Sequence, residues 1–102
     1  MIVDGHTHLF SLDTERYPLA NPEADYRPEA DGSAETLKQE MDASGVDRAL
    51  TITAGFYGWD NATTMDILRG RVDWLAGGVL VDPASEDGPD ELTRLVEAGA
   101  SG

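Results

Sequence analysis

The sequence predicts an α/β fold built on a parallel sheet, and two observations support this class. Stretches rich in apolar and β-branched residues alternate with stretches of helical periodicity, and glycines or prolines separate them. A strand, a crossover helix and a second strand form a right-handed unit, so the two strands lie parallel and adjacent. We count three such β/α units in the 102 residues, and Ala100–Gly102 begins the approach to a further strand.

The first predicted strand, residues 2–9, carries the only two histidines of the chain. Because side chains alternate faces along a strand, His6 and His8 are expected to share one face near the strand's end, with Asp4 on the same face. Two such imidazoles can reach one divalent ion, and imidazole suits zinc, manganese or iron. Asp4 then either supports one of the histidines or covers the polar face of the strand.

Start and stop signals set the expected bounds of the other elements. A residue suited to an N-cap precedes each helix-like stretch, and a glycine follows it. The strand-like stretches are rich in β-branched residues and apolar enough to be covered on both faces. These signals predict helices over residues 33–44, 62–69 and from 87 or 88 to 98, and strands over residues 46–53 and 75–83.

Three motifs resemble the amidohydrolase-related group of the amidohydrolase superfamily. The apolar Ile2-Val3 followed by Asp4-Gly5-His6-Thr7-His8 is similar to the superfamily's first barrel strand, which ends in His-x-His. Tyr57-Gly58-Trp59-Asp60-Asn61 is similar to a Tyr-Gly-x-Asp-Asn run of that group, and residues 75–83 resemble its third strand, which ends in Asp-Pro. The resemblance implies a partial (β/α)₈ TIM barrel, first three β/α units only, as a single incomplete domain over residues 1–102.

The resemblance also implies an activity. It points to a hydrolase that cleaves a C–O or C–N bond in a small carboxylated substrate of lactone or amide type. A metal-dependent decarboxylase or hydratase of the same superfamily is the alternative. His6 and His8 would bind zinc or manganese, but some members hydrolyse lactones without metal, and the two histidines would then bind a substrate carboxylate.

The resemblance leaves the catalytic residues unknown. The family takes its other ligands and its acid/base groups from strands four to eight, which this chain does not contain. Lys38, the sole lysine, is expected in the middle of a helix facing solvent, so we do not assign it as a bridging ligand.

The loop after the second predicted strand contains the expected substrate-binding residues Tyr57, Asp60 and Asn61. A structural alternative stands beside this assignment: Asn61 caps the next helix, Asp60 favours its positive end, and Trp59 covers apolar surface. Asp82 follows the third predicted strand, where a barrel presents working groups, but Asp before Pro also begins turns, and we favour the turn.

A long excursion without periodicity, residues 9–32, follows the histidine strand. In a barrel such a βα-loop lies over the mouth where substrates bind. Arg16, Tyr17, Tyr26 and Arg27 are the residues there able to hold an anionic or aromatic substrate. The alternative is a solvated acidic loop held in place by its two tyrosines.

Composition excludes several classes of function. Twenty acidic against seven basic residues give a net charge of −13, which repels phosphate backbones and anionic membrane surfaces, so neither nucleic acid nor membrane is expected as a partner. The chain has no cysteine and no apolar run of about 18 residues, so a cytoplasmic location is the default.

The length limits what the chain can do alone, since a complete (β/α)₈ barrel needs roughly 200 residues or more. We therefore interpret the sequence as an amino-terminal fragment or truncated product with an incomplete active site. The non-enzymatic alternative is a folded α/β module that self-associates through its exposed strand edges.

Overall fold

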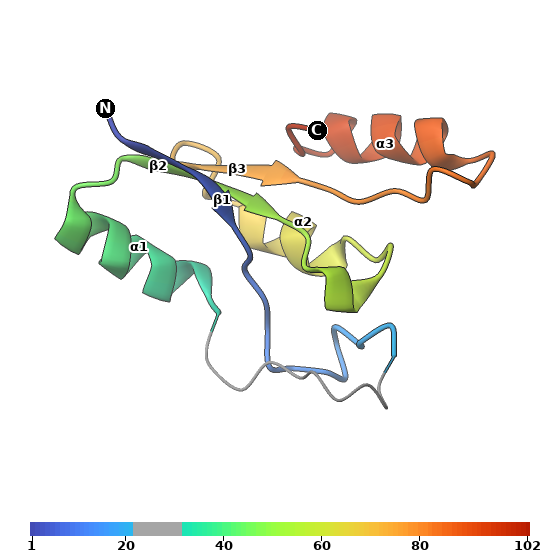
Figure 1. Cartoon of the computed structure of the whole chain (residues 1–102), viewed down its shortest axis with the longest axis horizontal. Helices are drawn as coiled ribbons and strands as arrows, with labels where there is room; N and C mark the ends of the chain where they lie inside the picture. The colour runs from blue at the N-terminus through green and yellow to red at the C-terminus, as the bar shows by residue number, and fades with distance from the viewer. Residues whose placement is uncertain (22–31) are drawn as a thin grey trace.

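The computed structural model describes residues 1–21 and 32–102, and strands alternate with helices along them (Figure 1). The elements are β1 (Val3–Thr7), α1 (Ala34–Ser44), β2 (Arg48–Ile52), the short 3₁₀ helix η1 (Gly55–Tyr57), α2 (Ala62–Leu68), β3 (Leu75–Gly78) and α3 (Gly88–Glu97). The strands form one parallel sheet in the order β1-β2-β3. This confirms the predicted α/β class and its three β/α units.

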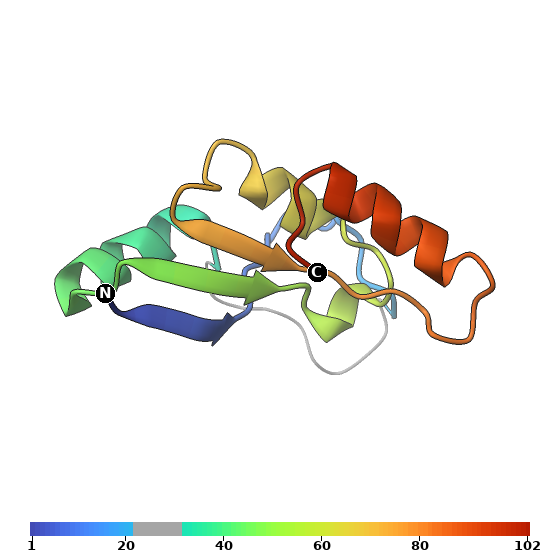
Figure 2. The same ribbon diagram turned by 90° about the horizontal axis from the view of Figure 1, so that it is seen from above.

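The helices lie in the arrangement that right-handed crossovers produce. Helices α1 and α2 lie on one side of the sheet, and α3 lies past the edge formed by β3 (Figure 1, Figure 2). Burial alternates along β2 and β3, because one face of these strands is covered by helices. The core between the sheet and the helices includes Met41 of α1, Ala49 of β2, Leu68 of α2 and Leu75 of β3.

The predicted signals bound α1 as expected. Ser33 is the N-cap, and its Oγ accepts a hydrogen bond from the backbone N–H of Thr36 at 3.3 Å. Gly45 ends the helix in the left-handed conformation, with φ of 74°, and its N–H bonds to the carbonyl of Met41. A residue with a Cβ would be strained at this position.

The third strand is shorter than predicted, since β3 ends at Gly78 rather than near residue 83. Its pairing with β2 stops where β2 leaves the sheet, at Ile52. Beyond that point the N–H of Val79 bonds to the carbonyl of Gly102 at 2.8 Å, and the N–H of Ser101 bonds to the carbonyl of Gly77 at 2.7 Å. The last residues therefore lie along β3, as the predicted approach to a further strand.

An irregularity in β1 changes the expected faces of its side chains. Asp4 pairs with Ala49 and Thr7 with Thr51, so three steps along β1 match two along β2. An extra residue of this kind shifts the alternation of faces. Both partners on β2 are buried, and Asp4, Thr7 and His8 all line one hollow beside α1. The register shift therefore interrupts the simple alternation of faces that the sequence predicts from Asp4 to His8.

Among the described residues, the longest helix has 11 residues, and none is long and apolar enough to cross a membrane.

Candidate functional site

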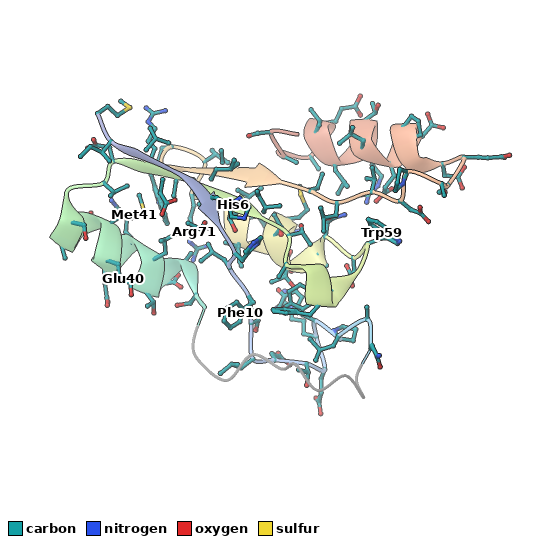
Figure 3. The ribbon with its side chains drawn as sticks, in the orientation of Figure 1. His6, Phe10, Glu40, Met41, Trp59 and Arg71 are labelled. Carbon is teal, nitrogen blue, oxygen red and sulfur yellow. The ribbon has the colours of Figure 1, made fainter. Side chains whose placement is uncertain are left out.

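The two histidines converge at the carboxyl end of β1, as the sequence predicts. Their Nε2 atoms lie 3.0 Å apart, and the rings meet edge to face with centroids 4.8 Å apart. Both residues are exposed. Figure 3 labels His6 on β1.

A backbone carbonyl of the neighbouring strand orients His8. Its Nδ1 lies 2.9 Å from the carbonyl oxygen of Ile52, at the end of β2. A carbonyl can only accept, so Nδ1 carries the proton, and in the neutral ring Nε2 then has a free lone pair. The contact between the two rings consequently makes Nε2 of His6 the donor. A hydrogen bond from the second nitrogen to a carbonyl is also what orients histidine ligands in metal sites.

The spacing of the two Nε2 atoms suits a shared ion. Two nitrogens that each lie 2.0–2.1 Å from one zinc ion are about 3.3 Å apart at the tetrahedral angle, close to the 3.0 Å between His6 and His8. The described residues contain no group of three or more histidine, cysteine or acidic side chains placed to hold an ion. The pair therefore fits as two ligands of a metal site and leaves the other positions open.

Asp4 does not contact either imidazole ring in this arrangement. Its Oδ1 accepts a hydrogen bond from the backbone N–H of His6 at 3.2 Å. The carboxylate therefore bonds to the backbone where the register of β1 shifts, and not to the imidazole of His6 or His8.

Tyr57 joins the loop after β2 to the loop after β1. The side chain is 3% exposed and packs with Leu19 and Ala54. Its hydroxyl accepts a hydrogen bond from the N–H of Ser11 at 3.1 Å and lies 3.4 Å from the carbonyl of the same residue. The predicted substrate contact of Tyr57 stays a prediction, while its contact with Ser11 is one the sequence did not indicate.

Asn61 precedes α2 as predicted, but its side chain does not cap the helix. The carboxamide instead bonds to Thr53, Trp59 and Leu80. Asp60 takes the expected place near the helix start, because its Oδ1 accepts from the N–H of Ala62 at 3.0 Å. The expectation that the Asn61 side chain caps α2 is therefore wrong.

Trp59 is 55% exposed, so about half of its side chain is covered. It lies toward α3 in Figure 3 and borders a groove of about 380 Å³ between α2 and α3. Asp82 begins a turn, as favoured from the sequence: its Oδ1 accepts from the N–H of Ala84 at 2.9 Å and its carbonyl from the N–H of Ser85 at 3.1 Å.

The described part of the long loop is held against α2. The hydroxyl of Tyr17 donates to Asp66 at 2.6 Å, and Arg16 pairs with the same carboxylate at 3.5 Å. This hydrogen bond, together with burial and the negative charge of Asp66, raises the pKa of Tyr17. The expected roles of Tyr26 and Arg27 lie outside the described residues.

Lys38 lies on α1, as expected from its place in the sequence. Its Nζ pairs with Asp42 at 2.9 Å and lies 5.5 Å from the ring centre of Trp74. The side chain is 40% exposed, and its contacts are with Asp42 and Trp74 rather than with the two histidines.

No family model matches this chain. Its fold is similar to solved structures, among them a chain from Acinetobacter baumannii described as a probable 2-pyrone-4,6-dicarboxylic acid hydrolase with citric acid bound. That match has a TM-score of 0.81 at 21% sequence identity and covers 99% of this chain and 36% of that chain.

Two further structures agree with this result. A chain from Pseudomonas putida, described as the same kind of hydrolase, matches with a TM-score of 0.74 at 22% identity, over 98% of this chain and 34% of that one. An Agrobacterium tumefaciens protein in its apo form gives a TM-score of 0.74 at 22% identity, over 97% of this chain and 34% of its own. At these identities the similarity establishes the fold, and this chain spans about a third of the length of each structure.

Proposed function

We propose that this chain supplies the first-strand part of the active site of an amidohydrolase-related hydrolase, with His6 and His8 as two ligands of a zinc or manganese ion. The observation that carries the proposal is the convergence of the two Nε2 atoms at 3.0 Å, with His8 oriented by the carbonyl of Ile52. The fold's similarity to chains described as 2-pyrone-4,6-dicarboxylic acid hydrolases supports it. The substrate class we propose is a small lactone that bears carboxylates.

The chemistry of such a site divides between the ion and the chain. A bound divalent ion polarises a carbonyl and lowers the pKa of a bound water. The chain's own residues orient this chemistry: Ile52 fixes the proton of His8 on Nδ1, and His6 can move its proton to Nδ1 to free its own Nε2. We propose that the remaining ligands and the proton-transfer group come from outside residues 1–102.

Calorimetric titration of zinc into the chain tests the metal pair. We expect weak, reversible binding, because two imidazoles leave the other positions to water. His6→Ala and His8→Ala should each weaken binding by about tenfold or more. Glu97→Gln is the matched control, since it removes an exposed carboxylate far along the chain and should change nothing. Equal affinity in the double histidine variant would reject the site.

A metal-free site, in which the histidines bind a substrate carboxylate, makes the opposite prediction. Citrate or an aromatic dicarboxylate would then shift the NMR signals of both imidazoles in buffer that contains a chelator. Zinc, added in a separate buffer without chelator, would shift the signals of neither histidine. That result would transfer the proposal from metal-assisted to metal-free lactone hydrolysis.

Activity assays test the second half of the proposal. Rate enhancement needs donors and bases held at about 3 Å from the reacting atoms, and we expect residues 1–102 to supply one side of the pocket. Residues 1–102 with added zinc should therefore give no turnover of lactones, amides or aromatic acids. Clear turnover that His8→Ala abolishes would show that these residues suffice.

Self-association along the open edge of β1 is a second candidate function, and the exposure of this strand favours it. Ile2 and Val3 are 56% and 57% exposed, and β1 lies at the end of the described sheet. An edge of this kind can pair with a second copy. The net charge of −13 opposes such pairing, so association should increase with ionic strength.

Analytical ultracentrifugation at low and high salt tests this candidate. Val3→Glu should abolish association, while Val72→Glu, at a 68% exposed position in the turn before β3, should leave it intact. A monomer at every salt and protein concentration would reject the candidate.

A further inference from the structure

The carboxamide of Asn61 uses its full hydrogen-bonding capacity inside the protein. Its Oδ1 accepts from Thr53 Oγ1 at 2.8 Å and from the N–H of Leu80 at 2.9 Å. Its Nδ2 donates to the carbonyl of Leu80 at 2.8 Å and to that of Trp59 at 3.2 Å. A carboxamide has two donor hydrogens and two acceptor lone pairs, so this set is complete. The residue is 5% exposed.

Two threonine hydroxyls continue the cluster around Asn61. The proton of Thr53 Oγ1 points to Asn61 Oδ1, since an amide oxygen can only accept. The 2.7 Å contact between Thr53 and Thr64 therefore has Thr64 as its donor. Thr53 and Thr64 are 1% and 2% exposed, and within the described residues no buried side-chain nitrogen or oxygen lacks a partner.

The two bonds to Leu80 repeat the pairing that a neighbouring strand would make. The ladder between β2 and β3 ends at Ile52 and Gly78, and the N–H of Thr53 closes it on the carbonyl of Gly78 at 3.0 Å. Beyond this point the chain after β2 turns into η1. The Asn61 amide accepts from the N–H of Leu80 and donates to its carbonyl. It therefore makes the two hydrogen bonds that the peptide groups of a neighbouring strand would make.

We propose that Asn61 is a positioning residue, which holds the chain leaving β3 against the end of β2, and that it does not bind substrate. A ligand would find no free donor or acceptor on its carboxamide. The assignment replaces the substrate-binding role expected from the sequence. It is independent of the proposed hydrolase activity, because it concerns contacts within the chain.

With this role for Asn61, the loop over residues 54–61 connects the carboxyl ends of β1, β2 and β3. Tyr57, near its middle, bonds to Ser11 in the loop after β1, and Asn61, at its end, bonds to Leu80 after β3. A change at Asn61 should therefore move the exit of β3 and leave the contact between His6 and His8 intact.

NMR of the unmodified chain provides the first test. A scalar coupling across the hydrogen bond should connect the backbone nitrogen of Leu80 with the side-chain carbonyl carbon of Asn61. The amide of Leu80 should also exchange slowly with solvent, although no backbone carbonyl is its partner. Absence of the coupling, with unprotected exchange at Leu80, would overturn the proposal without any substitution.

Asn61→Asp provides the second test, because it keeps the shape and removes both donor hydrogens. The carboxylate oxygen in the place of Nδ2 would then face the carbonyls of Leu80 and Trp59, and the Leu80 amide should lose protection by roughly ten- to a hundredfold. The amide of Ala49, bonded to the carbonyl of Trp74 at the other end of the sheet, should keep its protection. Gln39→Glu makes the same chemical change at an exposed site on α1 and should affect neither amide.

Lowering the pH distinguishes positioning from general destabilisation in Asn61→Asp. A protonated carboxyl regains one donor hydrogen, and burial favours this neutral form. Protection at Leu80, taken relative to the unmodified chain at each pH, should therefore return, and a failure to return would contradict the assignment. The comparison cancels the titration of the charged groups that line the same groove, which are Asp60, Asp66, Arg69, Glu91 and Arg94.

Discussion

Two polar clusters lie at the carboxyl ends of the strands, and they differ in burial and in free bonding capacity. His6 and His8 are exposed and bond to each other and to one carbonyl. Asn61 is 5% exposed, and each donor and acceptor of its carboxamide has a partner inside the protein. A fully satisfied buried network specifies one structure, whereas an exposed pair with lone pairs can accept a ligand. Similar positions at strand ends therefore serve different purposes.

Stability should separate the two clusters most strongly. Asn61→Ala removes the side-chain partner of the N–H and carbonyl of Leu80 in a partly buried site, and one of the partners of the buried Thr53 hydroxyl. We expect a loss of about 2–3 kcal/mol in the free energy of unfolding. His6→Ala removes an exposed side chain and should change stability by less than about 0.5 kcal/mol. Urea unfolding followed by circular dichroism measures both. Equal losses would remove the distinction between the clusters.

Zinc should act on the exposed cluster alone. Zinc at ten times its dissociation constant should stabilise the folded chain by about 1.4 kcal/mol, and thermal unfolding should detect the shift. His8→Ala should abolish the response, while Asn61→Asp should keep it if that variant folds. A response that survives in His8→Ala would place the ion elsewhere.

The sequence predicts the features of this protein that depend on neighbouring residues. The order of elements, the cap at Ser33 and the convergence of His6 and His8 follow from periodicity and from local chemistry, and the structure confirms them. The fold itself is confirmed by the similarity to solved structures. These features can be predicted without knowing which distant segments of the chain come into contact.

The features that the sequence did not predict depend on distant contacts. Asn is a residue type favoured at helix N-caps, and its place before α2 predicts that role for Asn61. Its side chain instead bonds to Leu80, 19 residues away, because it is buried against the chain that leaves β3. The contact of Tyr57 with Ser11 joins residues 46 apart. The extra residue in β1 becomes visible only through its pairing with β2. The substrate roles of Tyr57 and Asp60 stay predictions.

A third polar contact is intermediate in burial between the two clusters, and its loss should cost less stability than Asn61→Ala. The hydroxyl of half-buried Tyr17 donates to Asp66, whose carboxylate also pairs with Arg16 and Arg69. The hydrogen bond to Asp66 is the largest cause of a raised Tyr17 pKa, followed by burial and the charge of Asp66, while the two arginines lower it.

The sign of the pH dependence follows from this shift. The folded pKa of Tyr17 lies above the value of about 10 in the unfolded chain, so the contact stabilises the fold fully below that pH. Its contribution is lost as the pH rises through the raised folded pKa. Tyr17→Phe should therefore lower stability by no more than about 1 kcal/mol at neutral pH, and should remove this part of the alkaline loss.

Ultraviolet absorbance of tyrosinate, compared between the unmodified chain and Tyr17→Phe, isolates the titration of this one phenol. Asp66→Asn should move the pKa of Tyr17 down toward its ordinary value, because the carboxylate that accepts the proton's hydrogen bond is gone. If Tyr17 instead titrates at or below the ordinary value in the unmodified chain, Asp66 does not hold the long loop against α2. An effect as large as that of Asn61→Ala would show that partial exposure does not weaken such contacts here, and burial would no longer explain the difference between the clusters.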